Sequence, residues 1–262
     1  MWRTPEELVT IGFAQVRVVM MNEFHNGYLR CVRTREIGRR ILPIAHQAGV
    51  RFLAMEALHR EFAEEANYTR QVPEVKQGYL AQPEMRALIQ TALNLGWTLI
   101  PYEADFDKIP PELAQKEMMN QEVTNWREEV QARNIISALQ TLPFDTKLLV
   151  WCGNGHHTKE LLLVQKIFRD GKFFPKPENE PDWTPMGYLF KQMSGVDPFT
   201  IHQEVLITPH LPLDLLKECK TDIEAFGGTV GFLKKGIPHP SLSSFATHSG
   251  DAFVVSTDNV ME

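Results

Sequence analysis

The chain has 262 residues, 43% of them hydrophobic and 23% charged, with a formal net charge of -6. This composition is typical of an ordinary globular protein and excludes disordered and fibrous classes. The acidic balance argues against a nucleic-acid partner, because phosphate binding needs a basic surface. No apolar stretch approaches the roughly 18 residues of a membrane span, and the amino terminus lacks the features of a secretory signal. We therefore expect a cytoplasmic protein that binds a small molecule and neither nucleic acid nor membrane.

Helical and strand patterns alternate along the whole chain. Thr4 to Glu7 form a capping box with proline at the first helical position, so a helix is expected to begin there. Short apolar runs rich in β-branched residues predict buried strands, and apolar residues spaced three and four apart predict helices. In chain order, strands are expected at 16–21, 50–55, 97–101, 148–152, 199–207, 230–233 and 252–256, and helices at 4–14, 28–48, 57–66, 83–95, 110–142, 158–168, 186–194 and 213–225.

This alternation predicts an α/β protein with a mostly parallel sheet flanked by helices. No repeat and no linker divides the chain, so we expect a single domain over residues 1–262. The segment at about 170–185 is rich in proline, asparagine and glutamate. It should form an irregular loop, long enough to act as a lid.

Ionisable side chains follow the expected strands at their carboxyl ends, where ligands bind in open parallel sheets. Glu23 and His25 follow the first strand, Glu56 follows the second and Glu103 follows the third. With a spacing of two, Glu23 and His25 point to one side if the strand geometry persists. An imidazole with an unperturbed pKa of about 6.5 can take a proton near neutral pH. His25 is therefore a candidate base, with Glu23 and Glu56 as its supports.

The fourth strand runs into the sequence Gly153-Asn154-Gly155-His156-His157. Its glycines let the backbone approach a ligand closely, and the N–H groups there can bind an oxyanion. Adjacent histidine side chains diverge, so at most one should face the same pocket as His25, and we favour His156. A set of His25, His156 and one carboxylate would also suit zinc, which leaves a metal site as an alternative.

The long helix expected at 110–142 shows an apolar stripe of Met119, Val123, Trp126 and Val130. Arg133 continues the stripe. A guanidinium on a buried face is costly unless it is paired, so Arg133 should reach a carboxylate of the site or a bound anion. The alternative is that the helix bends and Arg133 reaches water.

These motifs resemble those of the erythromycin esterase-like proteins, which share a fold with the haem-uptake protein ChaN and show a weaker likeness to the TraB and TIKI group. The resemblance extends over residues 16–207. It rests on E-x-H after the first strand, L-A-M-E after the second, A-R-N-I-I in the long helix, V-W-C-G-N-G-H-H after the fourth strand and M-G-Y-L-F-K-Q-M-S-G at 186–195.

The resemblance implies a metal-independent hydrolase in which a histidine activates water. That role falls on His25, with Glu23 and Glu56 as supports and with His156 or His157 as the second histidine. Arg35 matches the supporting arginine best, and Arg33 is nearly as well placed. The chain departs from the family in having one residue rather than two between Glu and His, and in being shorter than the macrolide esterases.

We therefore expect an esterase-like hydrolase of a small molecule without a cofactor, zinc and haem being the less favoured options. Two other functions stay open, a glycoside hydrolase that uses the carboxylates of Glu23 and Glu56, and a non-enzymatic haem or metal carrier resembling ChaN. The oligomeric state is left open. The expected catalytic residues are His25, Glu23, Glu56 and His156, and the expected substrate-binding residues are Arg35, Arg133, Asn154, His157 and Glu103.

Overall fold

A computed structural model describes residues 1–23, 32–118, 120–162, 166–169, 172–178, 180–205, 213–240, 242–243 and 248–256. The strands are β1 (Val18–Asn22), β2 (Phe52–Met55), β3 (Thr98–Pro101), β4 (Leu148–Cys152), β5 (Lys166–Arg169), β6 (Lys172–Pro175), β7 (Phe199–Val205), β8 (Thr229–Leu233) and β9 (Ala252–Ser256). The α-helices are α1 (Pro5–Gln15), α2 (Val32–Gln47), α3 (Arg60–Thr69), α4 (Pro83–Asn94), α5 (Pro111–Ala114), α6 (Gln121–Thr141), α7 (Met186–Ser194) and α8 (Leu213–Ala225).

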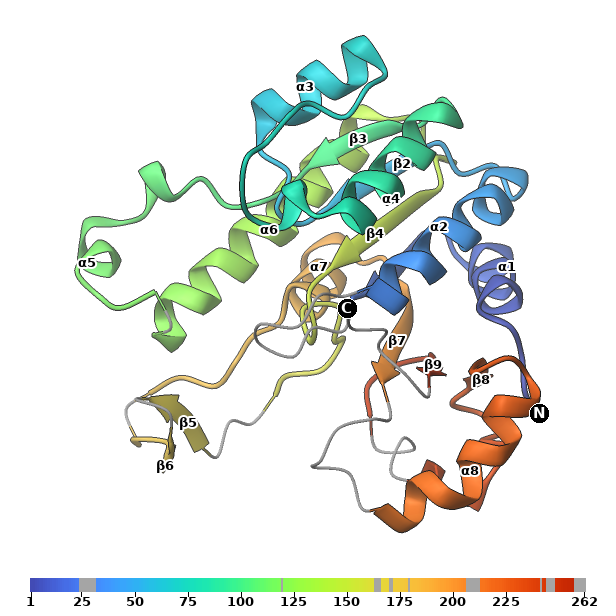
Figure 1. Cartoon of the computed structure of the whole chain (residues 1–262). Coiled ribbons are helices and arrows are strands. Elements are labelled where there is room, and N and C mark those ends of the chain that lie inside the picture. Colours follow the sequence, from blue (N-terminus) through green and yellow to red (C-terminus); the bar gives the residue numbers. More distant parts are fainter. Residues whose placement is uncertain are drawn as a thin grey trace.

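The main sheet has seven strands in the order β3-β2-β4-β1-β7-β9-β8 (Figure 1). All neighbours pair in parallel except β8, which runs antiparallel to β9. This confirms the expected α/β fold with a mostly parallel sheet. β4 lies between β1 and β2 although it follows both in the chain. The carboxyl ends of β1, β2 and β4 therefore meet at the centre of one edge.

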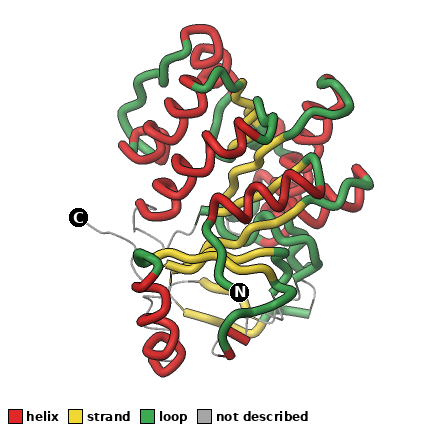
Figure 2. The backbone as a smooth tube through the Cα atoms, turned by 90° about the vertical axis from the view of Figure 1, so that its right-hand side faces the viewer, coloured by secondary structure: helices red, strands yellow, loops and turns green. Residues whose placement is uncertain are grey.

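Helices cover both faces of the sheet (Figure 2). Successive side chains of a strand alternate between faces, so a strand buried on both sides must be continuously apolar. In β1, Val19 and Met21 pack with helices α1, α2 and α4, whereas Val18 and Met20 pack with α6 and α7. This two-sided burial explains why the apolar run at 16–21 signals a strand.

On each edge strand, one residue has its outer backbone N–H and C=O groups paired. At β3, the side-chain amide of Asn67 accepts from Leu99 N at 2.8 Å and donates to Leu99 O at 2.9 Å. At β8, Arg3 and Gly231 exchange two backbone hydrogen bonds of 2.7 Å. These contacts protect edges that would otherwise offer unpaired groups to another chain.

Most expected elements lie where the sequence placed them. The helices at 186–194 and 213–225 and the strands at 148–152 and 252–256 have the bounds that were expected. The capping box also forms, since Glu7 N donates to Thr4 Oγ1 at 3.2 Å and Thr4 N donates to Glu7 Oε2 at 2.7 Å.

Three expectations are wrong in whole or in part. The helix expected at 158–168 is absent from the part of that segment that is described, where residues 166–169 instead form β5 and pair with β6. This hairpin also replaces part of the irregular loop expected at about 170–185. The single helix expected at 110–142 is divided into α5 and α6, and α6 begins after its own N-cap, Asn120, whose Oδ1 accepts from Glu122 N at 3.0 Å.

No helix of the described residues is long and apolar enough to cross a bilayer.

Candidate functional site

Two glutamates lie on either side of the carboxyl end of β4. Glu23 N donates to Cys152 O at 2.8 Å, and Glu56 N donates to Trp151 O at 3.0 Å. Each residue therefore extends the pairing of its own strand by one step beyond the sheet. Glu23 follows the β1 residues that pack on α2, and Glu56 follows β2 toward α6. The two expected glutamates thus lie at the same sheet edge, Glu23 toward the face covered by α2 and Glu56 toward the face covered by α6.

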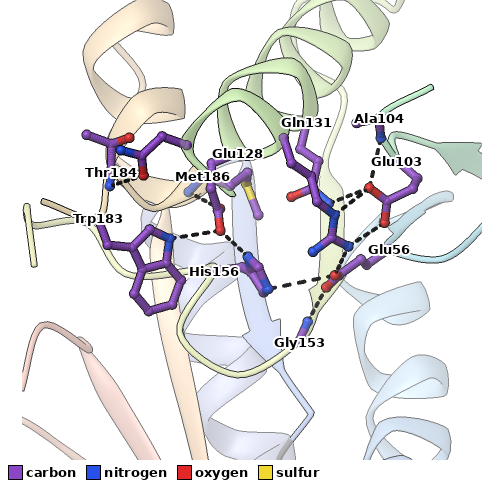
Figure 3. Close-up of polar contacts among 12 residues, drawn as sticks. Glu56, Glu103, Ala104, Glu128, Gln131, Gly153, His156, Trp183, Thr184 and Met186 are labelled. Atoms are coloured by element: carbon purple, nitrogen blue, oxygen red, sulfur yellow. Dashed lines mark hydrogen bonds and ion pairs between the residues drawn. The ribbon is translucent and has the colours of Figure 1, made fainter. Parts of the chain in front are cut away.

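Glu56 is held as a carboxylate by partners from two directions. Arg127 Nη2 of α6 donates to Glu56 Oε1, and Gly153 N donates to Glu56 Oε2 at 2.5 Å (Figure 3). Burial by itself would raise the pKa of Glu56, but the positive charges of His156 and Arg127 outweigh it and lower the pKa below its usual 4.5. Glu56 is consequently ionised at neutral pH.

Arg127 is fixed by a fork of hydrogen bonds to Glu103. Its Nε and Nη2 atoms donate to the two Glu103 carboxylate oxygens at 2.9 and 2.6 Å. Glu103 Oε1 also accepts from Gln131 Nε2 at 2.9 Å and from Ala104 N at 2.8 Å. Bidentate pairing of this kind adds geometric definition as well as energy. Glu103 therefore belongs to the site as the residue that orients Arg127.

His156 lies between two carboxylates. Its Nδ1 is 2.5 Å from Glu128 Oε1, an ion pair rather than an aligned hydrogen bond, and its Nε2 is 3.7 Å from Glu56 Oε1. Burial would lower the pKa of His156, but Glu56 and Glu128 raise it to about 9. His156 is therefore an imidazolium at neutral pH. Its Nε2–H lies beyond the 2.7–3.2 Å range of a hydrogen bond to Glu56 and can donate elsewhere.

Glu128 is fully buried and connects His156 to the segment before α7. Its carboxylate accepts from Trp183 Nε1 at 3.0 Å and from Met186 N at 2.6 Å. The Trp183 ring meets His156 edge to face, with centroids 5.8 Å apart and an angle of 86°. Gly155 adopts φ 89°, and a Cβ built there would lie 2.5 Å from the Trp183 ring. Glycine is therefore needed at this position for Trp183 to cover the loop.

Glu23 has a separate arginine. Arg35 Nε and Nη2 donate to its two carboxylate oxygens at 2.9 and 3.0 Å, and Trp151 Nε1 donates at 3.2 Å. Arg35 also donates to Gln82 Oε1 and has no exposed surface. Arg35, expected to bind substrate, thus lies beneath the surface and fixes Glu23. The other arginine considered, Arg33, pairs with Glu36 at 3.3 Å.

The remaining expected residues fall in different places. His25 lies outside the described residues. Asn154 is exposed and its Oδ1 accepts from Asn22 Nδ2 at 3.1 Å. His157 is buried and turned toward His202, which agrees with the expected divergence of the two histidines. The prediction that Arg133 is buried and paired with a site carboxylate is wrong, because its side chain is 64% exposed and pairs with Glu129 at 2.7 Å.

The sequence-based interpretation missed Arg127, Glu128 and Gln131. The signal was present, since Val123, Arg127, Gln131, Ile135 and Leu139 repeat every four residues along one face of α6. That face is apolar where it covers the sheet and polar where it passes the carboxyl edge. Arg127 and Gln131, the polar residues on this helical stripe, were therefore better candidates for the site than Arg133.

The site has limited suitability for a metal. Among the described ranges, no group of three His, Cys, Asp or Glu side chains is arranged to hold an ion. His156, held by two carboxylates, keeps the proton that it would have to lose in order to coordinate a metal.

No protein-family model matches the chain, and no curated protein sequence matches it. Among solved structures, a mutant of erythromycin esterase EreC in its open conformation is similar over 97% of both chains, with a TM-score of 0.56 and 12% identity. The effector domain RRSP of a MARTX toxin from Vibrio vulnificus gives a TM-score of 0.44 and 14% identity over 76% of this chain and 35% of that chain. The type III effector HopBA1 gives 0.45 and 13% over 80% and 88%.

The likeness to EreC defines a class of fold. The main sheet of the chain, with mostly parallel strands, lies between two layers of helices, and this arrangement is similar to the fold of erythromycin esterase EreC. It spans about a third of the length of the Vibrio toxin chain. At such identities, the similarity concerns the fold alone.

Proposed function

We propose that the protein is a hydrolase of the erythromycin esterase-like type, in which water activated by His25 attacks an ester or related bond of a small molecule. The observation that supports this most strongly is the placing of His156 between Glu56 and Glu128 at the carboxyl edge of the sheet. The fold shared with EreC agrees with it.

In this proposal, the two histidines have different tasks. His156 carries its proton at neutral pH because two carboxylates raise its pKa to about 9. A group in that state cannot accept a proton from water, but it can stabilise negative charge on a substrate oxygen. The base must therefore be another residue. His25 is two positions from Glu23, which lies at the same edge, and it is our candidate.

The reaction then proceeds with ordinary ester chemistry. His25 removes one proton from water as the water oxygen bonds to the carbonyl carbon. The carbonyl oxygen gains negative charge, which His156 Nε2–H stabilises. When the bond to the alcohol oxygen breaks, the proton held on His25 passes to that oxygen, and the products are a carboxylic acid and an alcohol. Charge stabilisation by a preorganised donor is commonly the largest contribution in such sites.

The glycosidase alternative is less well supported. Such an enzyme needs one carboxylic acid that stays protonated, which requires a raised pKa. The pKa of Glu56 is lowered, and Glu23 pairs with the buried Arg35. A haem or metal carrier is also less well supported, since it would need a neutral imidazole where His156 is charged.

A panel of aryl esters and aryl glycosides tests the proposal. The purified protein should hydrolyse at least one ester, and Glu56→Gln and His156→Asn should each lower kcat about 10²–10³-fold, as loss of a charge-stabilising group does. His59→Gln is the matched control, because His59 is exposed and its side chain makes no cap hydrogen bond. Turnover of a glycoside, with esters untouched, would replace the proposal by the glycosidase.

A further inference from the structure

A second group of histidines lies beside the loop that carries His156, which we call the histidine loop (residues 153–158). His157 Nε2 is 3.4 Å from His202 Nδ1 of β7, and His202 Nε2 is 3.2 Å from Glu204 Oε2. The rings of His157 and His202 are 5.3 Å apart between centroids and inclined by only 18°. His248, just before β9, places its ring centroid 5.6 Å from that of His202. A chain of polar contacts thus connects β7 to the histidine loop.

The direction of the hydrogen bonds in this chain follows from the carboxylate. A carboxylate only accepts, so His202 donates from Nε2 to Glu204 and, as a neutral ring, accepts at Nδ1. His157 must then donate from Nε2. His157 Nδ1 is buried and has no hydrogen-bond partner among the described residues. Within the described part of the chain, the link to β7 is therefore the one hydrogen-bond contact of the His157 ring nitrogens.

The number of extra protons on the neutral His157–His202 pair decides whether the link can form. One extra proton can be accommodated, because a charged His202 can donate to a His157 that has moved its own proton to Nδ1. A second proton leaves two N–H groups facing each other across 3.4 Å and places two like charges side by side.

Neighbouring charges oppose that second proton. Burial, His202, His156 and His248 all lower the pKa of His157 well below 6.5. Burial and His202 lower the pKa of His248, with Lys234 adding to this and Glu204 opposing it.

We propose that Glu204 and His202 are positioning residues that act through His157 to hold the histidine loop, and with it His156. They do so while His157 and His202 together carry at most one proton more than in their neutral forms. The opposite side of the loop is tied to α7, because Gly187 N donates to His156 O at 2.7 Å. The loop is thus held from two sides, one of which depends on pH. Any effect of this loop on turnover rests on the proposed function, whereas the coupling of Glu204 and His202 to the position of His156 does not.

The coupling can be measured without a substrate. Hydrogen exchange of residues 153–158 and the NMR titration of the His156 ring should be compared at pH 7.5 and 5.5 in the wild type, His202→Gln and Glu204→Gln. His59→Gln serves as the control. Loss of one buried hydrogen bond should speed exchange in the loop by about 10-fold at pH 7.5 in both variants. Because the low pKa of His157 opposes the second proton, the wild type should still exchange more slowly than the variants at pH 5.5 and should approach their rate only at a lower pH.

The His156 titration separates positioning from general stability. If the loop loosens, His156 moves away from Glu56 and Glu128, and its pKa should fall below about 9 in both variants. Exchange in β1 and β4 should stay unchanged, which shows that the fold is intact. Unchanged loop exchange in both variants, or a His156 pKa that does not move, would overturn the proposal. If His202→Gln fails to fold, Glu204→Gln alone decides the outcome.

Discussion

His156 and His157 are consecutive in the chain, yet at neutral pH the side chain of His156 is charged and that of His157 is neutral. His156 faces Glu56 and Glu128, which raise its pKa to about 9, whereas His157 faces His202 in a buried place where its pKa is well below 6.5. The two residues lie in the turn that follows β4, and their side chains point to different sides, so one dipeptide supplies two environments. One histidine is thereby a fixed positive charge of the candidate site, and the other ties the loop to β7.

The raised pKa of His156 predicts a loss of stability at alkaline pH. Its ordinary pKa is about 6.5. The stabilisation by Glu56 and Glu128 is therefore fully present below pH 6.5 and is lost as the pH rises through about 9. The free energy of unfolding in urea should fall by on the order of 3 kcal/mol between pH 6.5 and 10. His156→Asn should flatten this dependence, and an equally steep fall in that variant would contradict the assignment.

Glu128, together with Glu56, should support the charge on His156. In Glu128→Gln, the amide keeps a similar shape but loses the negative charge 2.5 Å from Nδ1. The pKa of His156 should therefore fall from about 9 toward its ordinary value. NMR titration of the imidazole ring gives this directly. Glu129→Gln, one residue along α6 and paired with the exposed Arg133, is the control and should leave the titration unchanged.

Two arginines of α6 should respond very differently to replacement by methionine. Arg127 holds the carboxylates of Glu56 and Glu103, so Arg127→Met leaves both partly buried charges without their common partner. Because Arg127 is about a quarter exposed, the expected loss is about 1–3 kcal/mol, less than for a fully buried pair. Arg133→Met should change stability by less than about 0.5 kcal/mol. Urea unfolding of the two variants compares them, and equal losses would refute the different placements.

Gly155 should be required for the covering of His156 by Trp183. An alanine there meets positive φ and places its Cβ 2.5 Å from the indole, so Trp183 must move. Gly155→Ala should cost about 1–3 kcal/mol. Gly195→Ala is the control, because Gly195 also has positive φ but nothing within 4 Å of its Cβ. Quenching of tryptophan fluorescence by acrylamide should increase in Gly155→Ala only. Equal quenching in the two variants would show that Trp183 does not depend on Gly155.

The strands could be predicted because burial on both faces makes them continuously apolar. Two other features were hidden for physical reasons. On α6, the residues that turn toward the site are polar, so the apolar stripe stops where Arg127 and Glu128 begin, and Trp126 and Val130 suggested a face that is only partly buried. Between β5 and β6, the dipeptide at 170–171 is Asp-Gly, a strong hairpin signal that the surrounding proline-rich sequence obscured.

The site could be predicted only in part. Glu56 and His156 were expected because each follows a strand at the carboxyl edge. Glu128 and Arg127 belong to α6 and do not follow a strand. Only the packing of α6 against the sheet brings them to Glu56 and His156. The spacing along α6 indicates which residues face inward, but it does not show which distant residues they contact.

The pH dependence of kcat/KM on an aryl ester tests the central claim most directly. With His25 as base and His156 as charged donor, the wild type should give a bell-shaped profile that falls below about pH 6.5 and again near pH 9. His156→Asn should lose the alkaline limb, and His25→Ala should lower the rate about 10²–10⁴-fold while the fold stays intact. Near-normal turnover by His25→Ala, or an alkaline limb that persists in His156→Asn, would contradict the account.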